Sequence, residues 1–332
     1  MIKEGVSSLI FDGHSDIFTD VLIRRLEGET QILNKYHLPR LRKGNIDGGC
    51  FVLWIDPPYA MENPADRMEQ LLRAVSEELH ECKDACLVHN LADIQAAQAQ
   101  GRFYILLGLE GLSAIGEDLD GINWLYDFGA RHAMLTWNEQ NALATGVQGE
   151  CARGLTDLGK RAVRRIQDLG MILDVSHLNE RSFWDVMALA NGPIIASHSN
   201  ARALADAARN LKDDQLKAIR DTDGLIGLNS FNLFVSQTVS EQTIDRFVDH
   251  AVYIAEKIGV EHVGFGFDFF EFISTDKMRS YSDQDTSYTV GMEDRTKVPT
   301  FMDKLKKAGF SDAELAQIAY KNWFRVIEKV LG

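Results

Sequence analysis

Two potential metal ligands, His14 and Asp16, follow a short apolar run near the start of the chain. The run is formed by Leu9, Ile10 and Phe11, and its composition is typical of a buried strand. Alternate residues of a strand point to the same side, so an imidazole and a carboxylate two positions apart can be directed at one metal ion. The same pattern also fits a solvated histidine and aspartate at the end of a strand, so the choice between the two interpretations depends on the rest of the chain.

Later apolar runs also end in ionisable residues. These residues are Glu110 after 103–109, His177 after 171–175, His198 after 193–197 and Asp268 after 262–267. A single catalytic zinc usually takes three protein ligands and a water molecule. Three histidines and three carboxylates exceed that number, so the set suits two divalent ions that share a carboxylate. Imidazole combined with carboxylate favours zinc, although iron, cobalt or manganese can occupy such a site.

The elements that would position these residues alternate between short apolar runs and longer amphipathic segments. Strands are predicted for the short runs, which lie at 8–12, 49–55, 103–109, 132–137, 171–175, 193–197, 225–228 and 262–267. Helices are predicted for 64–89 and for 241–258, which has one apolar stripe at helical spacing. Ser311 and Glu314 form a capping box before a last helix that runs to about residue 330.

Strands that alternate with helices predict a parallel sheet, and eight is the number of strands that closes a (β/α)8 TIM barrel. We therefore predict an α/β fold in which residues 1–332 form a single barrel. In a barrel the carboxyl ends of all strands surround one mouth, so the six ionisable residues would meet there. His132 and His262 open strands, at the other end, and are interpreted as structural or solvated. An open doubly wound sheet is the alternative fold, but no glycine-rich phosphate loop follows an early strand.

The composition restricts the partners of the protein. A hydrophobic content of 45% with 9% aromatic residues is sufficient for a large core. The formal net charge of −14 opposes binding to nucleic acid or to an anionic membrane. We find no apolar stretch long enough for a membrane span and no signal sequence, so we expect a cytoplasmic location. The segments 24–37 and 272–297 show no clear periodicity and predict long loops.

As a set, the motifs resemble the membrane (renal) dipeptidase family, peptidase family M19 of the amidohydrolase superfamily. The matching segments occur in order along nearly the whole chain, at 12–16, 108–111, 173–177, 193–200, 208–210 and 262–268. The resemblance implies two zinc ions. By the pattern of the family, His14 and Asp16 would bind the first ion and Glu110 would bridge both. His177 and His198 would bind the second ion.

The resemblance also implies roles around the substrate. Asp268 would hold and deprotonate the bridging water, and Arg209 would receive the carboxylate of the second residue of a dipeptide. A surface ion pair of Arg209 with Asp206 or Asp213 is the simpler alternative. The sequence departs from the family at Trp137, where a functional histidine is usual. We expect Trp137 to form a wall of the substrate pocket.

Two further departures, Phe231 and Phe270, replace a tyrosine and an aspartate that are common in the family. Together with Trp137 they leave the metal ligands in place and make the pocket more apolar. We therefore expect an altered choice of substrate rather than a loss of activity.

The function implied by the resemblance is that of a zinc-dependent dipeptidase. It would hydrolyse small dipeptides, including those with a C-terminal D-residue, by means of a hydroxide that bridges the two metal ions. One alternative is an amidohydrolase that cleaves another amide or a lactone, and a neutral lactone would not need Arg209. Another is a catalytically inactive metal-binding barrel, which predicts eroded ligands. A homodimer is implied only by the resemblance.

Overall fold

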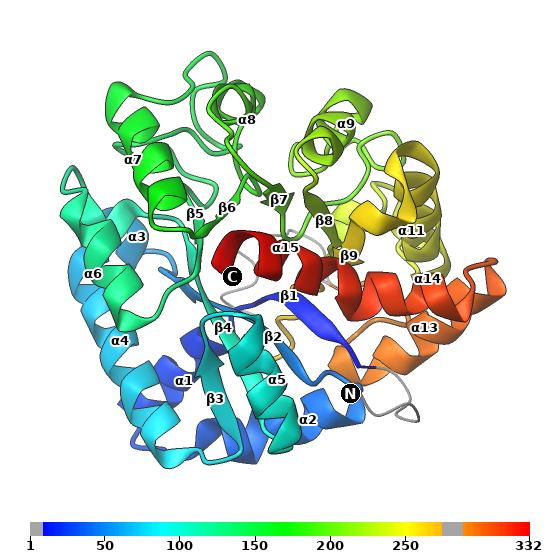
Figure 1. Ribbon diagram of the computed structural model, residues 1–332, viewed down its shortest axis with the longest axis horizontal. Coiled ribbons are helices and arrows are strands. Elements are labelled where there is room, and N and C mark those ends of the chain that lie inside the picture. Colours follow the sequence, from blue (N-terminus) through cyan, green and yellow to red (C-terminus); the bar gives the residue numbers. More distant parts are fainter. Residues whose placement is uncertain (1–8, 274–287) are drawn as a thin grey trace.

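The structure is a computed structural model that describes residues 9–273 and 288–332. A closed ring of eight parallel strands forms its centre, with helices on the outside (Figure 1). In ring order the strands are β1 (Phe11–Ser15), β2 (Gly48–Trp54), β4 (Phe103–Glu110), β5 (His132–Met134), β6 (Ile172–Asp174), β7 (Ile194–Ala196), β8 (Leu225–Leu228) and β9 (Val263–Phe265). Pairing of β2 with β4 and of β1 with β9 closes the ring. The predicted (β/α)8 TIM barrel is therefore confirmed.

A ninth strand, β3 (Ala85–Val88), lies outside this ring and corrects the prediction of one helix over 64–89. The helix α4 (Pro64–Glu81) ends earlier, because Cys82 already has an extended backbone. Strand β5 pairs only with Gly108–Glu110 at the carboxyl end of β4. The first half of β4 is therefore free to pair with β3. This long-range pairing overrides the helical tendency of the segment.

The helices follow the predicted alternation with the strands. They are α1 (Ile17–Leu26), α2 (Leu38–Lys43), α3 (Tyr59–Glu62), α4, α5 (Leu91–Ala99), α6 (Asp120–Phe128), α7 (Asp157–Asp168), α8 (Glu180–Met187), α9 (Asp213–Asp221), α10 (Asn232–Val235), α11 (Ile244–Ile258), α13 (Val298–Lys307), α14 (Asp312–Ala316) and α15 (Asn322–Leu331). Helix α11 confirms the prediction for 241–258. The capping box of Ser311 and Glu314 is confirmed at the start of α14.

The two predicted long loops have different outcomes. Segment 24–37 is not a long loop, because α1 continues to Leu26 and a helical turn at Leu33–His37 leads directly into α2. Of the segment 272–297, residues 274–287 lie outside the described residues, and Arg295–Lys297 forms a short helical turn. No helix among the described residues is long and apolar enough to cross a membrane.

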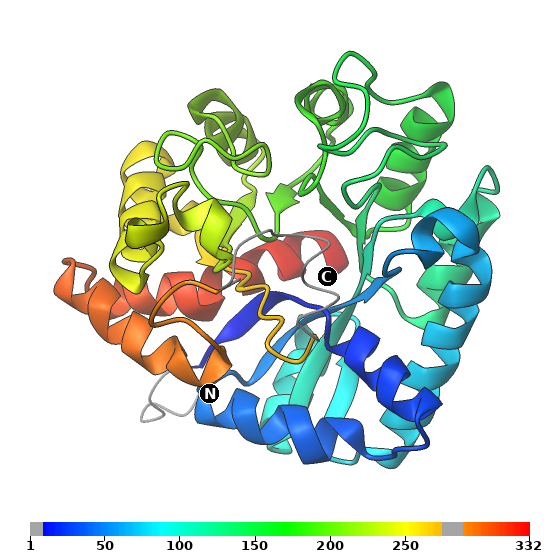
Figure 2. The ribbon, with the colours of Figure 1, turned by 180° about the vertical axis from the view of Figure 1, so that it is seen from behind.

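Helix α15 closes one end of the barrel. It lies across the ring of strands in Figure 1, and in Figure 2 it lies behind them. Its fully buried Trp323 packs against Phe11 and donates a hydrogen bond to the Phe265 carbonyl at 2.9 Å. A Cβ atom at Gly13 would lie 2.0 Å from the Trp323 ring, so glycine at this position makes room for the helix. The opposite end, where the strands terminate, remains available for a functional site.

Candidate metal centre

The side chain of His14 is fully buried at the end of β1. Three of the predicted carboxylates lie around it. Its Nε2 atom lies 3.3 Å from Glu110 Oε2, 3.6 Å from Asp16 Oδ2 and 3.9 Å from Asp268 Oδ1. Asp16 lies just beyond the strand, at the start of α1, and Asp268 follows β9. The ends of β1, β4 and β9 therefore bring one imidazole and three carboxylates to one point.

The other oxygen of Glu110 faces the remaining two histidines. Its Oε1 atom lies 2.8 Å from His177 Nε2 and 3.8 Å from His198 Nε2, and these two nitrogens are 2.8 Å apart. The carboxylate thus has one oxygen toward His14 and the other toward His177 and His198. This is the geometry that a ligand shared between two cations requires.

Several buried atoms of this cluster have no hydrogen-bond partner in the structure. They include both ring nitrogens of His14 and Oδ1 of Asp16. Buried polar atoms in proteins almost always have partners, and a cation would satisfy these. Ligand atoms of His14, Glu110 and His198 all lie within 4.8 Å of one another, and so do those of His14, Asp16 and Asp268. The residues present therefore fit divalent metal ions.

The electrostatics of the cluster also favour cations. Burial, reinforced by the charge of Asp16, raises the pKa of Glu110 to about 8. Burial likewise raises the pKa of Asp268 to about 7. Burial lowers the pKa values of His177 and His198, which keeps their imidazoles neutral. Neutral imidazoles and ionised carboxylates are the forms that bind metal, and bound cations would stabilise the carboxylate charges that burial disfavours.

Two of these residues have an unusual backbone conformation. His177 has φ of 71° and Asp268 has φ of 57°, in the left-handed region that residues other than glycine rarely adopt. Such a conformation costs about 1–3 kcal/mol and occurs preferentially at functional sites. The surrounding structure must therefore hold both side chains in position.

Three polar residues form hydrogen bonds to the predicted ligands. Their role was not predicted from the sequence. Asn138 Oδ1 lies 2.8 Å from His177 Nδ1, and Ser197 Oγ lies 2.8 Å from His198 Nδ1. Asn229 donates a hydrogen bond from Nδ2 to Asp268 Oδ2 at 3.0 Å. All three residues end or follow a predicted strand, so their positions alone could have indicated that they lie near the site.

Arg209 lies beside the cluster with its guanidinium almost completely buried. It donates to the His198 carbonyl at 3.2 Å and to Ser199 Oγ at 3.4 Å, and its Nε has no partner. It forms no ion pair with a described residue, since Asp206 pairs with Arg202 and Asp213 with Lys257. The alternative of a surface ion pair is therefore wrong. Burial lowers the pKa of Arg209 to about 10, so it remains charged at neutral pH.

One predicted apolar residue, Trp137, borders the cluster, and the other two, Phe231 and Phe270, contact each other. The ring of Trp137, after β5, lies 6.1 Å from that of His177 and 5.6 Å from that of Trp54 at the end of β2. On the side of β8 and β9, Phe231 contacts Phe270 with ring centres 5.4 Å apart. An aromatic ring therefore lies beside the imidazole of His177.

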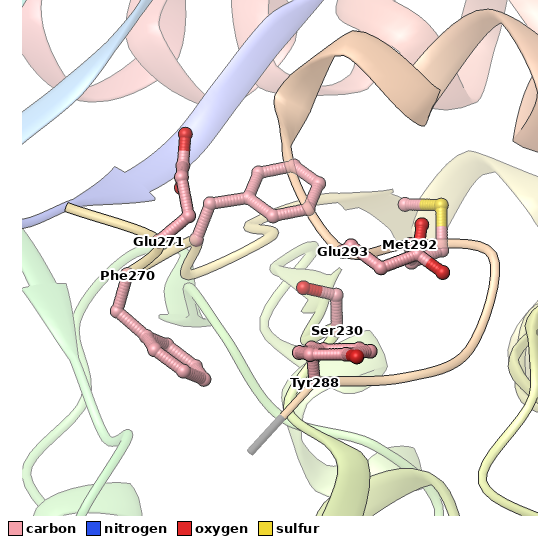
Figure 3. A pocket seen from close by; sticks show the side chains of 7 residues that line it. Ser230, Phe270, Glu271, Tyr288, Met292 and Glu293 are labelled. Atoms are coloured by element: carbon pink, nitrogen blue, oxygen red, sulfur yellow. The ribbon is translucent and has the colours of Figure 1, made fainter. Parts of the chain in front are cut away.

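A cavity of about 320 Å³ adjoins Phe270 and was not predicted from the sequence (Figure 3). It is lined by Ser230, Phe269, Phe270, Glu271, Tyr288, Met292 and Glu293. Figure 3 shows the side chains of Phe270 and Glu271 directed away from each other. Glu271 faces Arg295 and Arg40, at 3.4 and 3.5 Å, so its charge is already compensated.

A (β/α)8 barrel with histidines and carboxylates gathered at its strand ends has the architecture of a metal-dependent hydrolase. The sequence model of the membrane dipeptidases, peptidase family M19, matches residues 5–331, and the chain belongs to this family. It is therefore a metallopeptidase of the dipeptidase class, and the predicted family is confirmed.

Individual proteins are similar to the chain in sequence or in fold. A dipeptidase described as a metallopeptidase of family M19 has a TM-score of 0.86 and 25% identity, covering 98% of this chain and all of its own. A metallopeptidase of Rhodobacter sphaeroides, liganded with a phosphinate mimic of the dipeptide L-Ala-D-Ala, has a TM-score of 0.84 at 24% identity and the same coverage. An uncharacterized dipeptidase of Schizosaccharomyces pombe is 28% identical over 96% of this chain and 80% of its own.

Proposed function

We propose that the protein is a zinc-dependent dipeptidase whose substrates are small dipeptides with a free C-terminal carboxylate. Arg209 carries this proposal. A buried charge is costly unless it is paired, and this guanidinium has no carboxylate partner among the described residues. The carboxylate of a bound dipeptide would be that partner. A neutral lactone offers none, so the position of Arg209 favours the dipeptide over this alternative.

We assign the metal ligands as the family pattern suggests. His14 and Asp16 hold one ion, His177 and His198 hold the other, and Glu110 bridges them. The opposed oxygens of Glu110 and the unpartnered atoms of His14 and Asp16 support this assignment. Imidazole with carboxylate ligands favours zinc. When bound, such ions activate water and polarise the scissile carbonyl.

The residues of the chain then supply position and proton transfer. Arg209 anchors the carboxylate of the second residue of the dipeptide. Asp268 takes the proton of the attacking water and returns it to the departing amine, as general base and then general acid. The hydrogen bond from Asn229 occupies Asp268 Oδ2, so Oδ1, which faces His14, is the oxygen available for the proton. Trp137 forms a wall of the substrate pocket, and the family resemblance extends the range to a C-terminal D-residue.

A pair of matched substrates tests the proposal. The protein is assayed with L-Ala-L-Ala and with its C-terminal amide, each with and without a chelator, and its metal content is measured. We expect metal-dependent hydrolysis of the free acid and a loss of at least about 100-fold in kcat/KM for the amide, since a buried partner of Arg209 is removed.

The variant Arg209→Met should abolish this preference by losing activity toward the free acid. The control Arg220→Met removes the same charge from the exposed face of α9 and should leave the preference unchanged. Equal rates for the acid and the amide would contradict the role of Arg209, and absence of bound metal would contradict the whole proposal. The cytoplasmic location and the homodimer stay predictions.

A further inference from the structure

A buried ion pair inside the barrel connects two neighbouring strands. His132 Nε2, at the start of β5, lies 2.8 Å from Asp174 Oδ2, at the end of β6, and both side chains are almost completely inaccessible. Although burial acts against it, the neighbouring Cys50 and Asp174 raise the pKa of His132 to about 10. The hydrogen bond from His132 lowers the pKa of Asp174 against the effect of burial. Both groups are therefore charged at neutral pH.

The second oxygen of Asp174 binds the two turns that carry metal ligands. Its Oδ1 accepts hydrogen bonds from the Ser176 N–H at 2.8 Å and from the Ser197 N–H at 3.2 Å. Ser176 directly precedes His177, and Ser197 directly precedes His198. One carboxylate thus fixes the backbone next to both imidazoles, and His132 fixes that carboxylate.

We propose that Asp174, held by His132, is a positioning residue that sets the separation of His177 and His198 for the second metal ion. The inference rests on the proposed function, because it assumes that these two imidazoles are ligands. His177 needs such support, since its left-handed backbone is strained. Residues that orient metal ligands commonly contribute 10- to 100-fold, roughly, to metal affinity.

The geometry makes the expected effect specific to one ion. Hydrogen bonds of Asp174 reach the turns after β6 and β7 but not His14 or Asp16, which belong to β1 and the start of α1. Loss of Asp174 should therefore weaken the binding of the second ion and leave the affinity for the first ion nearly unchanged. A purely structural role would lower the melting temperature without separating the affinities of the two ions.

The test compares zinc binding by the full-length wild type and by Asp174→Asn, titrated in chelator-buffered zinc after complete metal removal. We expect the wild type to bind two equivalents. The variant should bind the first with an affinity within about twofold of the wild type and the second about 10- to 100-fold more weakly. His132→Gln keeps a donor for Asp174 and should show a smaller loss at the same ion. This second variant keeps the inference testable if Asp174→Asn does not fold.

Glu78→Gln is the matched control. Glu78 is also a fully buried carboxylate that accepts a backbone N–H and pairs with an arginine, but it lies on α4. This variant should keep both affinities. Two unchanged affinities in Asp174→Asn or His132→Gln, or an equal loss at both ions, would overturn the positioning role. A wild type that binds no zinc would overturn the proposed function as well, so the two failures are distinguishable.

Discussion

At the scale of single residues, the site depends on carboxylates held in surroundings that disfavour their charge. Glu110 and Asp268 are both buried, and burial raises both pKa values. The two residues nevertheless have different contacts. Glu110 directs its oxygens to opposite groups of imidazoles, whereas one oxygen of Asp268 is occupied by Asn229. This difference fits the proposed roles of Glu110 as a bridging ligand and of Asp268 as the residue that moves a proton.

The variant Asp268→Asn tests this separation. Asparagine keeps the shape of the side chain but cannot accept the proton of the attacking water. We expect kcat to fall by about 100- to 10,000-fold, the usual contribution of a general acid or base. Metal content should stay near two ions per chain, because the imidazoles and Glu110 are unchanged. A variant that kept the kcat of the wild type would contradict the proton-transfer role, and measurement of bound metal shows whether a loss has another cause.

At the scale of elements, the site could be predicted wherever it depended only on strand ends. His14, Glu110, His177 and His198 each end or follow an apolar run, and a TIM barrel brings all such ends to one mouth. Their convergence therefore followed from the order of the runs. The extent of α4 could not be predicted in this way, because β3 replaces its last part only when β4 is present to pair with it.

The ion pair of His132 and Asp174 was missed for a related reason. His132 opens β5, and the sequence placed it at the end opposite to the chemistry. The buried pair agrees with a structural role for His132, but its partner was not predicted. Strand β5 has only three residues, and the side chain of the first one contacts Asp174 at the end of β6. A Cβ atom at Gly108 of β4 would lie 2.6 Å from the His132 ring, so the space for this ring depends on a third strand. Strand length and register decide this contact, and neither follows from a run of apolar residues.

Helix α15 closes the end of the barrel away from the site. A substitution in this helix should therefore lower the stability of the protein without changing its activity. Trp323→Ala removes a fully buried ring and its hydrogen bond to Phe265. We expect a loss of about 3–5 kcal/mol in the free energy of unfolding, measured by denaturant titration. The kcat/KM of the folded fraction should stay within about twofold.

The matched control for this helix is Trp124→Ala on α6. Trp124 is 55% exposed, and its removal should change the stability by about 0.5 kcal/mol or less. If Trp323→Ala instead lost activity without losing stability, α15 would contribute to the site in a way that its position does not explain.

At the scale of the whole molecule, the pH dependence of unfolding reports the buried charges. The net charge of −14 makes the folded chain strongly acidic, yet His132 is a cation inside it. The pKa of His132 is raised from 6.5 to about 10 on folding. Its contribution to stability is therefore complete below about pH 6.5 and is lost as the pH rises to about 10. Asp174, with a lowered pKa, contributes above about pH 3.8 and loses its contribution at lower pH.

The difference in the free energy of unfolding between the wild type and His132→Gln should therefore vary with pH. It should be largest between about pH 4 and 6.5 and should decrease steadily toward pH 10, because glutamine does not titrate. Denaturant titrations of both proteins in the presence of a chelator, at intervals of one pH unit, measure this difference without a contribution from bound metal. The same series with Glu78→Gln corrects for the general effect of pH on buried charges. A difference that stayed constant from pH 5 to 10 would mean that His132 is neutral, and Asp174 would then need another partner for its buried charge.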